Sequence, residues 1–190
     1  VGAATSIGTG KVYLIDKPDA PQSLILAAHV AASGARADDL ALETVMRNFG
    51  GMATARLNRN LRLEKHWSYG AYGGLGSARG PRLFSVIAPV QTDRTSDAML
   101  EVRKEIAGVA GARPLEGEEL DSILRSQVGR LAGRFETLNS LIGAGLEVAN
   151  LDRDPAYYTD YARQLRELDG KALNAAAAEV VKPDQLLWLV

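Results

Sequence analysis

The sequence predicts an α+β fold in which helices pack on one face of a mainly antiparallel sheet, giving two layers. Two observations carry this prediction. Before Thr92 the chain contains segments that alternate apolar and polar residues, as strands do, whereas after it the apolar residues recur at steps of three and four, as in amphipathic helices. A last apolar segment begins near Gln185 and predicts a strand that returns to the sheet.

The N-terminal part predicts two strands followed by two helices. Residues 11–16 and 22–32 read as strands, and the proline-containing segment between them indicates that the two pair as antiparallel neighbours. Helical spacing starts at Asp38 and stops at the glycine pair Gly50-Gly51. A second helical stretch runs from about Met52 to Lys65.

The segment from Ser68 to Ser77 is rich in glycine. It predicts a strand whose missing side chains allow another backbone to approach closely. The next strand is expected from Leu83 to Val90. Further helices are expected over the apolar stripes of residues 99–109 and 120–135, and over residues 138–151, 156–168 and 171–180.

Size and composition are those of an ordinary globular protein. The chain has 190 residues, of which 46% are hydrophobic and 24% charged, so residues 1–190 predict one domain with its own core. A net charge of −1 gives no electrostatic reason to expect nucleic acid or anionic lipid as a partner. No apolar run is long enough for a membrane span. The absence of cysteine excludes disulfides, zinc–thiolate sites and thiol nucleophiles.

Both ends of the sequence predict that the chain is cut from a longer protein. It starts at Val1 without a methionine or a leader, and it stops at Val190 within an apolar run. Any targeting segment would therefore lie upstream, and the compartment stays unknown. A chain without cysteine fits a bacterial periplasmic protein and a cytoplasmic one equally well.

The two histidines decide which chemistry the chain can perform alone. His29 and His66 lie 37 positions apart, so no HExxH or HxxEH motif exists to place two histidines and a carboxylate on one helix face around zinc. We interpret His29, within a strand, as a structural histidine and His66 as a loop residue. No GxSxG elbow and no GxxxxGK[ST] phosphate loop is present either.

One segment, from Phe49 to Ala71, has a distinctive order of residues. A glycine pair leads into a helical stretch with Arg-Leu and then Leu-Arg, and a tyrosine that opens a glycine-containing strand lies seven positions after the second arginine. The residues that make this pattern are Gly50-Gly51, Arg56-Leu57, Leu61-Arg62, Glu64 and Ser68-Tyr69-Gly70.

This order resembles the C-terminal, non-zinc domains of the pitrilysin/insulysin (insulinase-like) zinc peptidases, which include mitochondrial processing peptidase subunits. The resemblance extends over essentially the whole chain, through residues 88–93, through residues 133–137 in an expected long helix, and through residues 154–158. Ala55 stands where the family usually has Ser, Leu63 where it has Glu, and His66 where Gly is common.

The resemblance implies a non-catalytic, substrate-binding domain of a metallopeptidase. In that family a domain or subunit with HxxEH carries the zinc, and the two halves enclose a chamber. Arg62 and Tyr69 match the pair that donates hydrogen bonds to carbonyls of the bound peptide. Arginine is a permanent cationic donor, and tyrosine, with an ordinary pKa of about 10, is a neutral O–H donor at pH 7. The expected cofactor is therefore zinc in the partner, with no metal and no catalytic residue on this chain.

Two alternatives remain open from the sequence. The same fold serves as an inactive structural or assembly domain in the core proteins of the cytochrome bc1 complex. A zinc-bearing domain could also precede Val1 in the same polypeptide instead of belonging to a separate subunit. For Arg62 and Tyr69 the purely structural interpretation is that a cation ends a helix and a tyrosine starts a strand.

Overall fold

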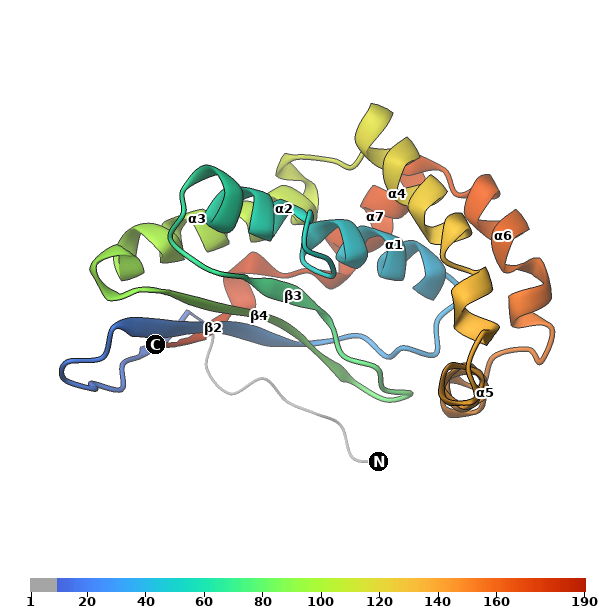
Figure 1. Ribbon diagram of the computed structural model, residues 1–190, viewed down its shortest axis with the longest axis horizontal. Coiled ribbons are helices and arrows are strands. Elements are labelled where there is room, and N and C mark those ends of the chain that lie inside the picture. Colours follow the sequence, from blue (N-terminus) through green and yellow to red (C-terminus); the bar gives the residue numbers. More distant parts are fainter. Residues whose placement is uncertain (1–9) are drawn as a thin grey trace.

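A five-stranded sheet with the order β1-β5-β2-β4-β3 forms one layer of the protein, whose computed structural model describes residues 10–190 (Figure 1). The two long central strands, β2 and β4, pair antiparallel along their whole length. β3 and β1 lie at the two edges. The strands are β1 (Val12–Tyr13), β2 (Gln22–Ala31), β3 (Tyr72–Leu75), β4 (Arg82–Gln91) and β5 (Leu187–Leu189).

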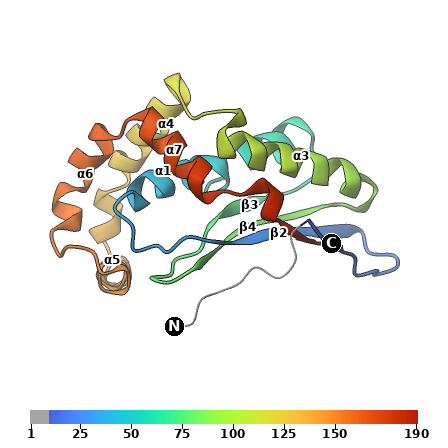
Figure 2. The same cartoon turned by 180° about the vertical axis from the view of Figure 1, so that it is seen from behind.

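The helices form the second layer, on one face of the sheet (Figures 1 and 2). α5 is the exception, because it lies beyond the end of the strands at about the level of the sheet (Figure 1). The helical elements are α1 (Asp39–Phe49), α2 (Arg56–Asn58), the π-helical turn η1 (Arg59–Glu64), η2 (Thr92–Arg94), α3 (Thr95–Ala107), η3 (Gly108–Ala112), α4 (Gly117–Gly129), η4 (Ala132–Phe135), α5 (Leu138–Leu151), α6 (Tyr157–Glu167), α7 (Gly170–Val180) and η5 (Pro183–Gln185).

The core lies between the two layers. Alternate residues of the central strands, such as Ile25 on β2 and Phe84 and Val86 on β4, are fully buried beneath the helices. Phe49, at the end of α1, stacks on Phe84 with ring centroids 5.8 Å apart. The predicted α+β fold, with helices on one face of a mainly antiparallel sheet, is therefore confirmed.

The expected pairing of the first two strands is wrong. Only Val12 and Tyr13 form a strand in the segment 11–16, and they pair in parallel with β5 instead of antiparallel with β2. β5 lies between β1 and β2, and its residue Trp188 lies opposite Val12 on one side and Ala27 on the other. A strand from the far end of the chain thus occupies the place that a local hairpin would need.

Several boundaries also differ from the predicted ones. Residues 52–55 form turns, and the expected helix 52–65 is the short α2 followed by the wider η1 turn. The glycine-rich strand is limited to residues 72–75. The long helix expected to include residues 133–137 is interrupted, because α4 ends at Gly129, and Thr137 is the N-cap of α5 in a capping box with Ser140.

The glycine-rich strand makes the close backbone contact that its composition predicts. The Gly73 N–H donates to the Gly50 carbonyl at 3.2 Å, so the end of α1 touches β3 backbone to backbone. A Cβ on Gly50 would lie 2.4 Å from the Gly73 nitrogen, and one on Gly73 would lie 2.8 Å from the Phe49 ring. Only glycine fits at either position.

His29 is a packed structural histidine, as interpreted from the sequence. It is buried and stacks on Phe84 at 5.0 Å between ring centroids. Its Nε2 accepts a hydrogen bond from the Lys182 N–H at 3.1 Å, which leaves the proton on Nδ1 to donate to the Val30 carbonyl at 3.0 Å. Burial lowers the pKa of His29 below its ordinary value of 6.5. The neutral ring therefore ties β2 to the end of α7.

This tie makes folding stability sensitive to acid. Because the pKa of His29 is lower in the folded state than in the unfolded one, the stabilising contribution of the neutral ring is present above pH 6.5 and is lost as the pH falls below that value. We expect His29→Leu to leave the Lys182 N–H without its partner, at a cost of about 1–3 kcal/mol at pH 7.5. The variant should also lose part of the pH dependence of the free energy of unfolding between pH 7.5 and 5.5, measured by urea denaturation.

His66→Asn is the matched control, because His66 is exposed and has a left-handed backbone (φ 57°) that asparagine tolerates. This control should keep the wild-type pH dependence. An equal pH dependence in wild type and His29→Leu would contradict the assignment.

Candidate functional site

Arg62 lies in the η1 turn and its side chain is exposed. Its backbone is held on the N-terminal side, since the neighbouring Leu61 is fully buried and the Leu61 carbonyl accepts from the N–H groups of Trp67 and Ser68, at 2.9 and 3.3 Å. Among the described residues, no hydrogen bond or ion pair engages the Arg62 guanidinium. The turn thus presents a permanent cation with free donors to solvent.

Tyr69 lies seven positions further on, in the loop that leads into β3, and is 89% exposed. The loop itself is rigidly held, because the Ser68 hydroxyl donates to the Pro89 carbonyl at 2.5 Å and the Ala71 N–H donates to Asn58 Oδ1 at 2.8 Å. An aromatic side chain on a fixed backbone, with no partner in residues 10–190, is poised for contact with another molecule.

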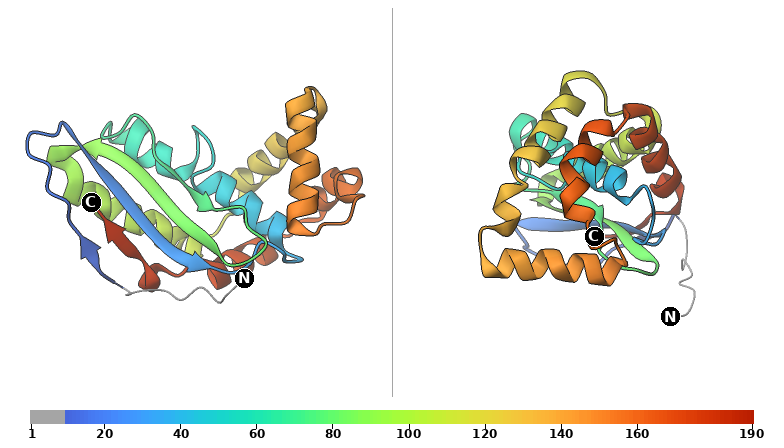
Figure 3. Two further views of the ribbon diagram at one scale, coloured as in Figure 1. Left: turned by 90° about the horizontal axis from the view of Figure 1, so that it is seen from below. Right: turned by 90° about the vertical axis from the view of Figure 1, so that its right-hand side faces the viewer.

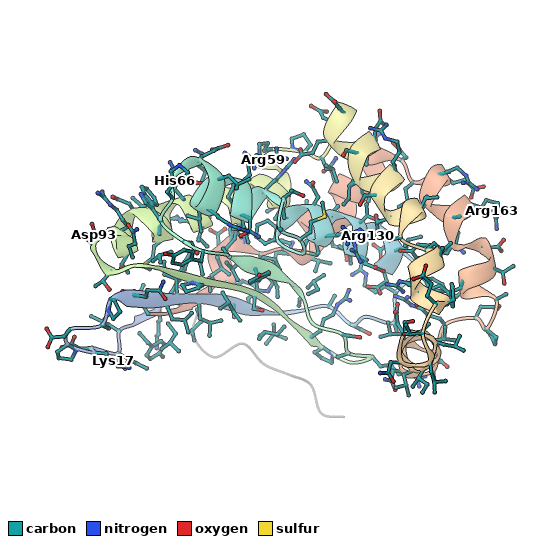
Figure 4. All side chains as sticks on the ribbon, viewed as in Figure 1. Lys17, Arg59, His66, Asp93, Arg130 and Arg163 are labelled. Carbon is teal, nitrogen blue, oxygen red and sulfur yellow. The ribbon has the colours of Figure 1, made fainter. Side chains whose placement is uncertain are left out.

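The structure brings these two sequence-predicted residues into adjacent segments. Leu61 and Ser68, which immediately precede Arg62 and Tyr69, are joined by a backbone hydrogen bond. Figure 4 shows His66, which lies between the two residues in the loop, on the helix side of the sheet. The left-handed backbone at His66 explains why glycine is common at this position in the family that the sequence resembles.

The described part of the chain offers no metal site. Within residues 10–190, no group of three or more His, Cys, Asp or Glu side chains lies close enough together to hold a metal ion. Both ring nitrogens of His29 are engaged in hydrogen bonds, and His66 lies in a separate exposed loop. The residues present therefore do not fit the zinc of the family. None of the helices described is long and apolar enough to cross a membrane.

A cavity of about 540 Å³ opens at the other end of β3 and does not include Arg62 or Tyr69. Its walls come from α1, from α5 and from the backbone of residues 73–77. In an antiparallel pair of strands, only every second residue exchanges hydrogen bonds with the neighbouring strand. Gly74 and Gly76 are the residues that face β4 in this way, so the N–H and C=O groups of Leu75 point away from β4, toward this cavity. The edge strand therefore has free backbone groups at the cavity.

The wall of this cavity contains a network of charges that sequence reasoning missed. Arg153 donates to Asp39 at 2.6 Å and also pairs with Glu147. Glu147 in turn accepts from Arg134 at 3.1 Å and from the Tyr158 hydroxyl at 2.8 Å. These residues come from α1, η4, α5, α6 and the loop after α5, so no local sequence pattern could have joined them.

Glu43 is the least compensated carboxylate of this wall. Burial raises the pKa of Glu43 above its ordinary value. The guanidinium of Arg134, with its Nη2 3.4 Å from Glu43 Oε1, acts in the opposite direction and lowers this pKa. The network anchors α5 to α1 and shapes the cavity. Its charges are mostly satisfied within the chain, which indicates a structural role.

Arg56 is also structural, although it belongs to the same sequence pattern as Arg62. It is buried and donates to both oxygens of Glu119, at 2.9 and 2.5 Å, and to the carbonyls of Arg113 and Pro114. These bonds hold the pKa of Glu119 at about 2. Arg56 thus joins α2 to the connection between η3 and α4. Of the two arginines, only Arg62 is free to act on another molecule.

The fold and this surface define a two-layer domain that has no metal-binding cluster among residues 10–190 and carries exposed donors on a loop held by hydrogen bonds. Residues 3–126, well over half of the chain, match the family described as "Peptidase M16 inactive domain". The chain belongs to the M16 peptidase family, as an inactive domain, and the resemblance to pitrilysin/insulysin peptidases is confirmed. A search of curated proteins by sequence gave no match.

Solved structures show the same fold. The peptidase M16 inactive domain from Pseudomonas fluorescens superposes with a TM-score of 0.83 at 20% identity, over 100% of this chain and 45% of that one. A protease from Helicobacter pylori gives 0.81 at 18% identity, over 94% and 43%. A chain of Complex III2 from Candida albicans gives 0.72 at 10% identity, over 94% and 45%. The chain thus spans less than half the length of these three proteins.

The Arg56–Glu119 pair predicts a clear effect on stability. Arg56→Met leaves the half-buried Glu119 carboxylate with Asn48 as its remaining donor, so we expect a loss of about 1–3 kcal/mol in the free energy of unfolding at pH 7. Arg59→Met, a change at an exposed arginine on the following turn, should change it by no more than about 0.5 kcal/mol.

The pH dependence follows from the same pair. In the folded state the pKa of Glu119 lies at about 2, below its ordinary value of 4.5. The contribution of the ionised Glu119 to the free energy of unfolding is therefore present above pH 4.5 and is lost as the pH falls toward 2. Chemical denaturation of both variants and of the wild type at pH 7 and pH 3 measures how the free energy of unfolding depends on pH. Equal stabilities for Arg56→Met and Arg59→Met at pH 7 would contradict the structural role.

Proposed function

We propose that this chain is the substrate-binding, non-catalytic domain of a zinc metallopeptidase. In this proposal it supplies Arg62 and Tyr69 to backbone carbonyls of a peptide, in a chamber shared with a domain or subunit that carries HxxEH and the zinc. The observation that carries the proposal is the presence of two exposed hydrogen-bond donors, without partners among the described residues, on a segment fixed by buried neighbours. Its membership in the inactive class of M16 domains supports it.

Rigid presentation is what such a role needs. A donor accelerates a reaction only if it is already placed where charge develops, so that no reorganisation is needed in the transition state. The hydrogen bonds of Ser68 and Ala71 hold the Tyr69 backbone, and buried Leu61 holds that of Arg62. Beyond the contact between Gly73 and Gly50, the edge of β3 at Leu75 offers further backbone groups that an extended peptide can pair with.

The second candidate is an inactive structural domain in a larger assembly. The likeness to a chain of Complex III2 from Candida albicans favours it. The two candidates differ at Arg62 and Tyr69, because a scaffold has no use for exposed donors there. Kinetics in the assembled protein therefore discriminates between them.

In the assembly with its zinc-bearing half, we expect Arg62→Ala and Tyr69→Phe each to lower kcat for peptide hydrolysis by about 10²- to 10³-fold, because each removes a donor to the developing oxyanion. Arg59→Ala and Tyr72→Phe are matched controls, since both are exposed residues of the same type nearby. Neither control should change kcat. Unchanged turnover in both test variants would favour the scaffold.

We also expect the isolated chain to bind only substoichiometric zinc and to hydrolyse no peptide, because the described residues provide no ligand set. Metal analysis after dialysis against zinc, together with a fluorogenic peptide assay, checks this. About one tightly held zinc per chain would contradict it.

A further inference from the structure

The two donors of the proposed peptide site lie on different segments, so the spacing between them depends on how these segments are joined. Arg62 belongs to the helical segment of α2 and η1, whereas Tyr69 belongs to the loop that leads into β3. The helical segment lies beside β3 on the helix side of the sheet (Figures 1 and 3). The packing is close, because the Leu57 side chain of α2 would lie 2.9 Å from a Cβ on Gly73.

Asn58 joins the two segments with both ends of its side-chain amide. It is the last residue of α2 and is only 1% exposed. Its Oδ1 accepts a hydrogen bond from the Ala71 N–H at 2.8 Å, and its Nδ2 donates to the Met52 carbonyl at 3.0 Å. Because one partner is a donor and the other an acceptor, together they fix which end of the amide is the oxygen. The side chain therefore bridges the turn before α2 and the loop after Tyr69.

Strand geometry directs the Ala71 N–H away from β4, toward Asn58. Ala71 immediately precedes β3, and every second residue of an extended segment points its N–H to the same side. Gly73, two residues further on, donates to the Gly50 carbonyl on that side. Ala71 is fully buried, so its N–H would lower stability if it had no acceptor. Asn58 supplies that acceptor, as Gly50 does for Gly73.

Tyr69 is thus tied to the helical segment on both sides. Immediately before it, the Ser68 N–H donates to the Leu61 carbonyl at 3.3 Å. Two residues after it, the Ala71 N–H donates to Asn58. The first tie joins two backbone groups, whereas the second depends on one side chain. A substitution at Asn58 therefore removes the second tie and leaves the first in place.

We propose that Asn58 is a positioning residue of the peptide site, whose buried amide clamps the Tyr69 loop to the segment that carries Arg62. This inference rests on the proposed function. Asn58 is buried and does not touch the peptide, so it acts through Tyr69. A donor stabilises the transition state only if it is already in place, and a small displacement of it costs rate. The clamp keeps both donors at one spacing.

Kinetics in the assembly with the zinc-bearing half tests the clamp. Asn58→Leu removes both hydrogen bonds at nearly constant size, and it should lower kcat about 10- to 100-fold while KM changes no more than about twofold. Asn174→Leu is the matched control, because the Asn174 amide accepts from the Leu115 N–H at 2.7 Å and donates to the Leu115 carbonyl at 3.0 Å, in a part of the chain that holds neither donor. At a temperature at which circular dichroism shows both variants folded, equal losses of kcat would overturn the proposal.

A conservative variant and an exchange measurement test the hydrogen bond itself. Asn58→Asp keeps an oxygen that accepts from the Ala71 N–H, so it should retain at least about fivefold more kcat than Asn58→Leu. Hydrogen–deuterium exchange of the assembled protein does not depend on activity. Residues 69–72 should exchange at least about tenfold faster in Asn58→Leu than in the wild type or in Asn174→Leu. Equal kcat in the two Asn58 variants, or unchanged exchange in this segment, would contradict the clamp.

A double-mutant cycle separates this inference from the proposed function. Because Asn58 acts through Tyr69, Asn58→Leu should lower kcat by no more than about threefold in a chain that already carries Tyr69→Phe. An undiminished loss in that background would overturn the positioning role and leave the proposed function standing. Unchanged kcat in Tyr69→Phe alone would instead overturn the role of Tyr69 in the proposed function, and the positioning role with it.

Discussion

The contact between Gly50 and Gly73 is the constraint on which the rest of the structure depends. A Cβ at Gly50 would lie 2.4 Å from the β3 backbone. The end of α1 therefore reaches the sheet only because both contacting residues, Gly50 and Gly73, lack side chains. This contact fixes where α1 stops, where β3 runs, and therefore how the intervening segment with α2 and η1 is folded. Arg62 and Tyr69 lie in that segment or just after it. The rigid presentation of the two donors follows from close packing some distance away from them.

The same packing divides the molecule into surfaces with different tasks. Buried charges are satisfied within the chain, as Arg56 is by Glu119 and Asp39 is by Arg82 and Arg153. Arg62 and Tyr69 are exposed and are left without side-chain hydrogen bonds or ion pairs in residues 10–190. Since a folded chain pairs its buried polar groups, exposed donors on a held backbone indicate where other molecules bind.

Local patterns allowed much of the fold to be predicted, and non-local contacts account for the rest. The bounds of α5 were predicted to the residue, and the glycine-rich strand correctly indicated a close backbone approach. The pairing of β1 with β5 could not be predicted, because the partners lie at opposite ends of the sequence. Arg62 and Tyr69 were proposed as site residues from their motif and stay a prediction, whereas the network of Asp39, Glu147 and Arg153 joins separate elements that no spacing relates.

The central claim is that the segment with Arg62 and Tyr69 contacts the peptide. The most direct measurement is photo-cross-linking in the assembled protein after chelation of its zinc, using a substrate peptide with a photoreactive residue near the scissile bond and mass-spectrometric mapping of the adducts. The account predicts adducts on this chain within residues 61–72, reduced in a variant with both Arg62→Ala and Tyr69→Phe. Adducts confined to other parts of this chain, or unchanged in the double variant, would contradict it.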